Sequence, residues 1–185
     1  MPVFLLMLVC AYGLAVMVYR YDMYDREPWY LLLLAVALGG AAGWVVGEFV
    51  QDSIIHWLGS AGQRIEWQAA IAAVLEETVK FTIVLGIALV FRTHFNDPLD
   101  GLIYGAFVGL GFAIEESRFY IGLESNGARQ IGPEAVRLFL HLLLGGLGAF
   151  GLGLARFPKR LRLWGIVLPL CLASSMVIHF LWDYW

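Results

Sequence analysis

Residues 67–91 read WQAAIAAVLEETVKFTIVLGIALVF, and this stretch decides which class of fold the sequence encodes. It is apolar over 25 residues except for a few polar positions, three of which are charged: Glu76, Glu77 and Lys80. About 20 apolar residues in a helix, at 1.5 Å each, cross the ~30 Å hydrocarbon layer of a bilayer. The stretch is therefore predicted to be a membrane-spanning helix with ionisable side chains inside the membrane.

The whole chain has the composition of a membrane protein. Of its 185 residues, 61% are hydrophobic and 15% are charged, whereas about a quarter of the residues in soluble domains are charged. Such a chain cannot build the polar shell of a soluble globule. Its net charge of −3 offers no basic surface for a nucleic acid. The expected environment is the lipid bilayer, and no nucleic-acid partner is expected.

Six apolar stretches are long enough to cross a membrane. They are residues 2–19, 29–50, 67–91, 98–120, 134–155 and 163–184. We therefore predict an all-α fold: a polytopic membrane helix bundle of about six transmembrane helices with a central polar cavity, in a single domain over residues 1–185. Residues 2–19 lack a basic leader and a small-residue cleavage site, so they are expected to be a first span rather than a signal peptide.

The connections predict orientation and one helix start. Seven Lys and Arg residues, several of them in 156–162, lie in the connections after the first, third and fifth spans, and four lie on the opposite side. Because positively charged loops stay in the cytoplasm, both termini are expected outside. Asp97 is expected to cap the fourth span, with Pro98 as its first helical residue.

Charged residues inside the membrane cost at least about 2.5 to 3.5 kcal/mol each on insertion scales. Glu76 and Lys80 are four residues apart and share a helix face, with Glu77 on the adjacent flank. One interpretation is an ion pair that only orders two helices. The second carboxylate argues against it, because neighbouring carboxylates repel each other and tend to keep one protonated, which suits proton transfer.

The fourth predicted span carries a second set of polar side chains. Phe112, Glu116 and Tyr120 recur every four residues and therefore lie on one helix face. Glu115 points about 100° away from that face. It is expected to face solvent, Arg118 or a neighbouring helix end.

Two histidines, His141 and His179, lie in the last two spans, and His141 follows Arg137 by four residues. Taken singly, an intramembrane histidine is more often a hydrogen-bonded helix contact than a ligand. Because the spans alternate in direction, both histidines fall with Glu76 and Glu116 in the outer half of the membrane. We therefore expect these four residues to form one site.

The motifs resemble those of the PrsW family of intramembrane proteases. The matching positions are EExxK at 76–80, FxxxExxxY at 112–120, a histidine at 141 and HxxxD at 179–183. DREPW at 25–29 and the order of the segments extend the resemblance over nearly the whole chain. That family is related to the type II CAAX prenyl endopeptidases, which have a histidine where this chain has Glu116 and often an asparagine where it has Asp183.

The resemblance implies an intramembrane endopeptidase in a bacterial or archaeal cytoplasmic membrane. Its substrates would be membrane proteins or peptides, for example anti-sigma factors. The residues fit this chemistry, because attack of water on an amide needs a base, a proton donor for the leaving amine and stabilisation of the oxyanion. The chain has no GxSxG motif and no Cys/His pairing, which argues against serine or cysteine protease chemistry.

The expected catalytic residues are Glu76, Glu116, His141 and His179, and the expected supporting residues are Glu77, Lys80, Asp183, Phe112 and Tyr120. Glu76 would act as base toward water, and Glu116 and His141 would hold that water. His179 with Asp183 would polarise the scissile carbonyl or orient a neighbouring group.

Glu77 and Lys80 would set the charge state of Glu76. The role of a metal stays open at this point. If zinc is bound, the expected ligands are His141, His179, Glu76 and Glu116. Because no HExxH motif is present, the sequence favours a metal-free glutamate mechanism over zinc.

Two other functional classes would use the same residues. A proton- or cation-coupled transporter also needs buried carboxylates and histidines, although the paired halves and broken helices typical of transporters are not found. A non-catalytic membrane scaffold is the second alternative. The presence of every proposed catalytic position argues against a scaffold.

The longest connection, residues 51–66, is expected to lie at the membrane interface. Its apolar side would consist of Ile54, Ile55, Trp57 and Leu58. Since a polypeptide needs an opening to reach a buried site, we expect this connection to act as a gate, with a plain surface linker as the alternative.

Overall fold

The computed structural model describes residues 2–21, 26–123, 131–156 and 164–185, and almost all of them are helical. The long helices are α1 (Pro2–Tyr21), α2 (Trp29–Val45), α4 (Ile65–Val90), α5 (Asp100–Leu123), α6 (Ile131–Arg156) and α7 (Trp164–Tyr184). A π-helical segment, η1 (Val46–Gln51), and α3 (Asp52–Trp57) continue α2, and η2 (Arg92–His94) is a short 3-10 turn. The predicted all-α fold is confirmed.

Three of the helical segments are long and apolar enough to cross a membrane: Trp29–Trp57, Gly132–Ala155 and Gly165–Tyr184. α1 adds a shorter apolar stretch, Leu8–Arg20. α4 and α5 are less uniformly apolar because they carry ionisable residues of the predicted site. The chain is thus a polytopic helical membrane protein, and the six predicted spans correspond to its six long helices.

Glycines bring α5 into direct backbone contact with its neighbours on two sides. A Cβ atom at Gly111 would overlap the carbonyl oxygen of Val36 on α2. On the other side, a Cβ atom at Gly105 would overlap the carbonyl oxygen of Gly145, and one at Gly109 that of His141. Small residues permit such close helix approach in membranes. The backbone of α5 therefore fixes how far α2 and α6 stand from it.

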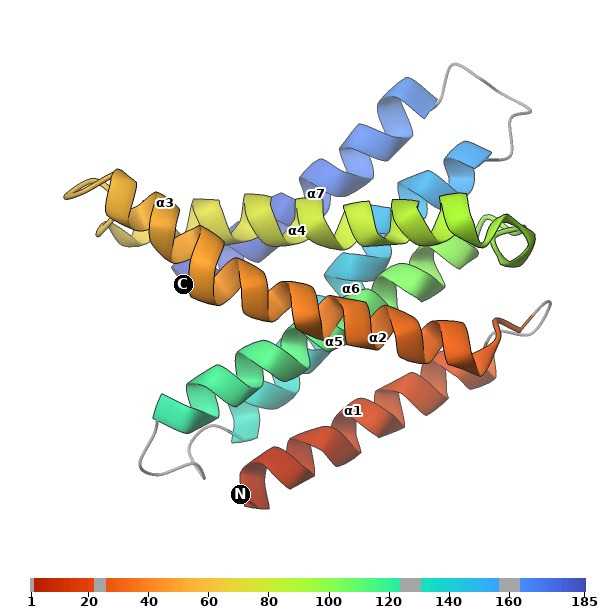
Figure 1. Ribbon diagram of the computed structural model, residues 1–185, viewed down its shortest axis with the longest axis horizontal. Coiled ribbons are helices and arrows are strands. Elements are labelled where there is room, and N and C mark those ends of the chain that lie inside the picture. Colours follow the sequence, from red (N-terminus) through yellow and green to blue (C-terminus); the bar gives the residue numbers. More distant parts are fainter. Residues whose placement is uncertain (1, 22–25, 124–130, 157–163) are drawn as a thin grey trace.

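The predicted site lies toward one end of the bundle. In Figure 1, α4 begins, α5 ends, α6 begins and α7 ends on the left-hand side, where α3 also lies and α1 begins. The antiparallel arrangement of neighbouring helices therefore places residues from the start of α4 and α6 beside residues from the end of α5 and α7.

The opposite end carries a buried polar cluster that the sequence reasoning missed. The hydroxyl of Tyr104 donates hydrogen bonds to the carboxylate of Glu27 and to the backbone oxygen of His94, the latter at 3.3 Å. Oδ2 of Asp100 accepts hydrogen bonds from the backbone N–H groups of Asn96 and Asp97 at 2.5 and 2.7 Å. These contacts fix the loop before α5 against the start of α2.

The second helix is longer than expected. The helix from Trp29 does not end at residue 50 but continues through Trp57, which shortens the expected connection 51–66 to residues 58–64. Gln51 and Asp52 follow Glu48 by three and four positions, and all three line one cavity, which is a helical pattern rather than that of a loop.

The start of α5 also differs from the expectation. Oδ1 of Asp97 accepts a hydrogen bond from the backbone N–H of Leu99 at 2.8 Å, as a capping residue does, but the regular helix begins at Asp100 rather than Pro98. Parts of three features used for the predictions lie outside the described residues: 157–163 of the basic cluster, Arg129 among the basic residues counted on the opposite side, and the first residue of DREPW.

We predict that Gly109→Ala destabilises the protein by about 1–3 kcal/mol, because the added methyl group must push α6 away from α5. Thermal unfolding of the detergent-purified protein measures this. Gly86→Ala on α4 is the matched control, since a Cβ atom there meets nothing within 4 Å. Equal unfolding temperatures for the two variants would contradict the close contact.

Candidate functional site

Lys80 lies at the centre of a buried cluster of ionisable groups. Its side chain is 1% exposed, and its Nζ atom lies 2.7 Å from Oε1 of Glu77 and 3.3 Å from Oε2 of Glu76. Nζ also lies 2.9 Å from Nδ1 of His141 on α6 and 4.8 Å from the ring centre of Phe112 on α5. The predicted contact between Glu77 and Lys80 is present, and the ammonium group joins three helices.

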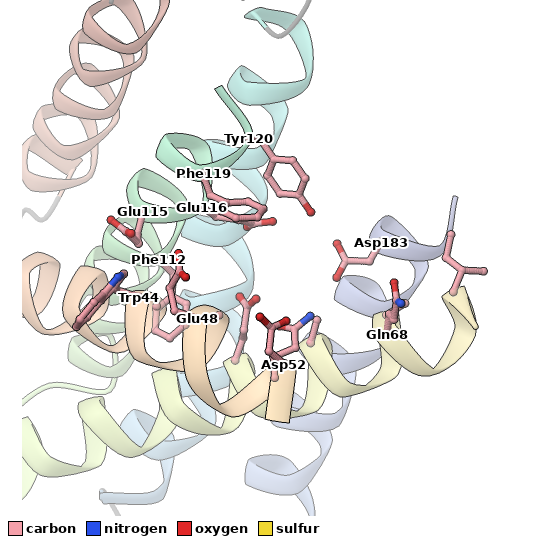
Figure 2. A pocket seen from close by; sticks show the side chains of 17 residues that line it. Trp44, Glu48, Asp52, Gln68, Phe112, Glu115, Glu116, Phe119, Tyr120 and Asp183 are labelled. Atoms are coloured by element: carbon pink, nitrogen blue, oxygen red, sulfur yellow. The ribbon is translucent and has the colours of Figure 1, made fainter. Parts of the chain in front are cut away.

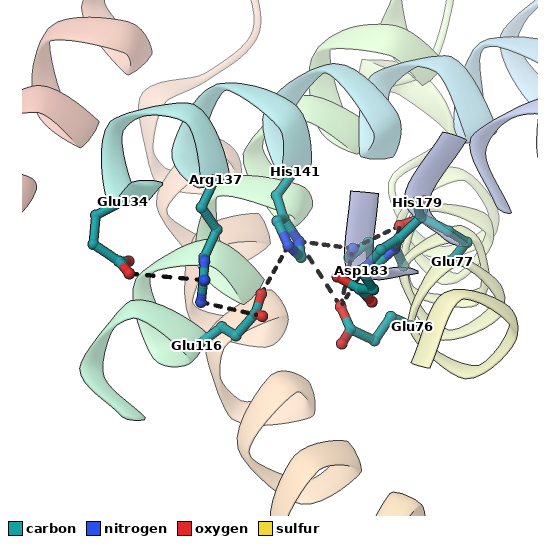
Figure 3. Close-up of polar contacts among 9 residues, drawn as sticks. Glu76, Glu77, Glu116, Glu134, Arg137, His141, His179 and Asp183 are labelled. Atoms are coloured by element: carbon teal, nitrogen blue, oxygen red, sulfur yellow. Dashed lines mark hydrogen bonds and ion pairs between the residues drawn. The ribbon is translucent and has the colours of Figure 1, made fainter. Parts of the chain in front are cut away.

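His179 connects α7 to the two glutamates of α4. Its Nδ1 atom lies 2.9 Å from Oε1 of Glu77. Its Nε2 atom lies 3.4 Å from Oδ2 of Asp183 and 4.0 Å from Oε2 of Glu76. The histidine is thus held between carboxylates on both of its ring nitrogens, as Figure 3 shows.

His141 makes the corresponding connection from α6. Its Nε2 atom lies 2.8 Å from Oε2 of Glu116 on α5, and its Nδ1 atom lies 3.8 Å from Oε2 of Glu76. The rings of His141 and His179 are 5.1 Å apart, centre to centre. The structure therefore brings together the four residues predicted to form one site, from four different helices.

Two further residues of the cluster come from the start of α6. Nη1 of Arg137 lies 3.2 Å from Oε1 of Glu116, and Nη2 lies 3.8 Å from Oε1 of Glu134. Glu134 is 2% exposed, and the sequence reasoning missed it. Glu134 precedes Arg137 by three residues and His141 by seven, so the three residues share a helix face. This spacing could have indicated from the sequence that Glu134 belongs to the site.

A cavity of about 410 Å³ opens beside the cluster. Glu76, Glu116 and Asp183 of the cluster line it, and Figure 2 labels Glu116 and Asp183 among the side chains around it. The remaining lining includes Trp44, Glu48, Gln51 and Asp52 from the α2–η1–α3 helix, Gln68 from α4, and Phe112, Glu115, Phe119 and Tyr120 from α5. The ionisable cluster is therefore accessible from a polar and aromatic cavity.

Two expectations about the edge of the cavity have different outcomes. Glu115 pairs with Arg118: Nε of Arg118 lies 2.9 Å from Oε1 of Glu115. Contact with Arg118 is one of the environments expected for Glu115. The expected apolar side of the gate, formed by Ile54, Ile55, Trp57 and Leu58, does not line the cavity. Instead, residues within 44–52 line it, because the helix runs on past residue 50.

The residues of the cluster fit a divalent metal ion. Glu76, His141 and His179 each offer one ligand atom, and these atoms lie within 4.8 Å of one another. Oε2 of Glu76 is buried without a hydrogen-bond partner. Two histidines and a carboxylate are a common ligand set for catalytic zinc.

The charge of the cluster supports the same conclusion. Its five carboxylates are those of Glu76, Glu77, Glu116, Glu134 and Asp183. Only Lys80 and Arg137 carry a permanent positive charge among them. A divalent cation would offset part of this excess of negative charge, which is costly to bury.

Comparisons with known proteins agree with the motifs. Residues 27–185 match the model of a family described as PrsW family intramembrane metalloprotease. Protease PrsW of Bacillus subtilis (strain 168) is 31% identical over 93% of this chain and 78% of its own length. The proteins of that name from Clostridioides difficile (strain 630) and Geobacillus kaustophilus (strain HTA426) are 36% and 30% identical, over 60% and 82% of this chain and 47% and 68% of their own lengths. No solved structure matches.

We predict that Lys80→Met destabilises the protein by about 3–5 kcal/mol, because it leaves buried carboxylates without their cation. Unfolding of the purified protein in detergent measures the effect. Arg64→Met is the matched control: its ion pair with Glu66 is exposed, and such pairs contribute about 0–1 kcal/mol. A loss for Lys80→Met no larger than for Arg64→Met would contradict the central role of Lys80.

Proposed function

The chain belongs to the PrsW family of intramembrane proteases, and on this premise we propose that it cleaves peptide bonds of membrane proteins at the cluster around Glu76. The observation that carries the proposal is the convergence of Glu76, Glu116, His141 and His179 on one side of a cavity. These residues are far apart in sequence, so their proximity results from the fold.

Peptide hydrolysis assigns complementary roles to these groups. A carboxylate must accept a proton from the attacking water and return it to the leaving amine. Glu76 and Glu116 both line the cavity, so each is accessible to water and to a substrate carbonyl. Among the described residues, Glu116 forms its ion pairs with Arg137 and His141, and we assign the proton transfer to it when Glu76 serves as a metal ligand. Without a metal, Glu76 takes this role, as the sequence suggested.

We propose that Glu76, His141 and His179 hold a divalent metal ion such as zinc. When bound, such an ion polarises the scissile carbonyl and makes water a stronger acid. Glu77 lies 2.9 Å from Nδ1 of His179, where it fixes the orientation and tautomer of the ring, so that Nε2, beside Glu76 and Asp183, would be the atom that binds the metal. The sequence alone favoured a metal-free mechanism. The ligand set, the excess of carboxylates and the family description support the metal-bound form.

The membership of the family supports a protease over the two alternatives considered from sequence, a transporter and a scaffold. The site lies where α4 and α6 begin and α5 and α7 end. With both termini outside, as the positive charges predict, this is the outer half of a bacterial cytoplasmic membrane. The proposed substrates are membrane-anchored proteins, with anti-sigma factors as one candidate class.

We predict that Glu76→Gln lowers the cleavage rate about 10²- to 10⁴-fold, because the amide neither accepts a proton nor binds a metal as a carboxylate does. The assay incubates the purified protein with a library of membrane-anchored peptides, and mass spectrometry maps the cleavage. Glu115→Gln is the control and should stay within severalfold of wild type, since its carboxylate pairs with Arg118. A loss in Glu115→Gln comparable to that in Glu76→Gln would show that the roles of Glu115 and Glu116 on α5 are assigned the wrong way round.

We predict that the purified protein contains about one divalent metal ion per chain, that a chelator abolishes cleavage and that zinc restores it. Elemental analysis measures the metal content directly. His179→Asn should lose the metal, whereas His56→Asn on the exposed helix α3 should keep it. A metal-free protein with full activity in chelator would instead establish the glutamate mechanism.

A further inference from the structure

Arg137 is a buried arginine beside the site that the hydrolysis described above does not use. It lies on α6, one helical turn before His141, and its side chain is 10% exposed. Its Nη1 atom lies 3.2 Å from Oε1 of Glu116. The guanidinium stacks over the ring of Tyr120 at 4.1 Å. Nε is buried without a hydrogen-bond partner, so the described residues satisfy the donors of the guanidinium only in part.

The two oxygens of Glu116 have different neighbours. Oε1 lies beside Arg137, whereas Oε2 lies 2.8 Å from Nε2 of His141. Polar contacts at both oxygens restrict rotation of the carboxylate about its terminal bond. Glu116 lines the cavity, so this restraint acts on a group that can reach substrate or water.

The guanidinium is itself held on two sides. Tyr120 lies under its flat face, and Glu134 lies 3.8 Å from Nη2 on the side away from Glu116. Figure 3 shows Arg137 between the two glutamates. A buried ion pair is often no more stable than a well-packed apolar pair, so the stability of the contact between α5 and α6 does not by itself account for an arginine here.

We propose that Arg137 is a positioning residue for the reaction: it holds Oε1 of Glu116 so that Oε2 stays directed toward His141 and the reacting water. The inference rests on the proposed function, because Arg137 acts through Glu116. It concerns the chemical step, so removal of the guanidinium changes kcat rather than substrate binding. Lysine replaces it poorly, because an ammonium group offers no planar fork and no flat face for Tyr120.

The test measures kcat and KM of the purified full chain on a membrane-anchored peptide that the wild type cleaves. Arg137→Ala should lower kcat about 10- to 100-fold with KM changed less than about twofold. Guanidinium ion, at a concentration that leaves the wild type folded and active, should restore part of the lost kcat. Arg118→Ala is the control: this arginine is half exposed and pairs with Glu115, so kcat should stay unchanged and guanidinium should have no effect.

An unchanged kcat, a rise in KM alone, or a loss that guanidinium does not reverse would overturn the positioning role. If Arg137→Ala does not fold, Arg137→Lys decides: a lower kcat at constant KM and constant unfolding temperature supports the role, and wild-type kcat overturns it. Glu116→Gln separates the two levels of the argument. An active Glu116→Gln variant refutes the proposed use of Glu116 in hydrolysis, whereas an inactive one beside a fully active Arg137→Ala refutes only the role of Arg137.

Discussion

The ammonium group of Lys80 is the interaction on which the centre of this protein depends. It lies within 3.3 Å of both glutamates of α4 and 2.9 Å from a ring nitrogen of His141 on α6. Glu77 also pairs with His179 of α7, and His141 also pairs with Glu116 of α5. Four helices thus share one charge network in surroundings where an uncompensated charge is costly. The same charge that compensates the carboxylates also fixes the relative rotation of the helices.

The sequence predicts the helices and the faces they turn inward, because both follow from local periodicity. The spacing of Glu76 and Lys80 was sufficient to place them in contact, and the antiparallel order of the spans was sufficient to place His141 and His179 at a similar depth. Specific contacts between helices do not follow from local periodicity. The pairing of Glu77 with His179 spans 102 residues and depends on the rotation of each helix about its axis. The periodicity of each helix taken alone does not reveal that rotation.

The errors at the second helix have a different cause. Residues 46–52 contain Glu48, Gln51 and Asp52, which suggest a membrane boundary when hydropathy alone is considered. They face the cavity, so their polarity reflects the lining of a site rather than the end of a helix. The π-helical turn at Val46–Gln51 has no composition signal of its own, although such turns are frequent at functional sites. Local polarity therefore has two explanations in a membrane helix, and the fold decides between them.

The continuous helix from Trp29 to Trp57 has 29 residues, and at 1.5 Å per residue it is about 43 Å long, against a hydrocarbon thickness of about 30 Å. Such a mismatch is relieved by tilt or by projection into the headgroup layer. The last third of this helix carries Glu48, Gln51 and Asp52 on the cavity side. Hydrolysis consumes one water molecule for every bond broken, and the acyl chains around the protein supply none. Since Glu48, Gln51 and Asp52 line the cavity beside Glu76, the overlong helix extends the polar lining of the site, and the tilt that positions this lining depends on membrane thickness.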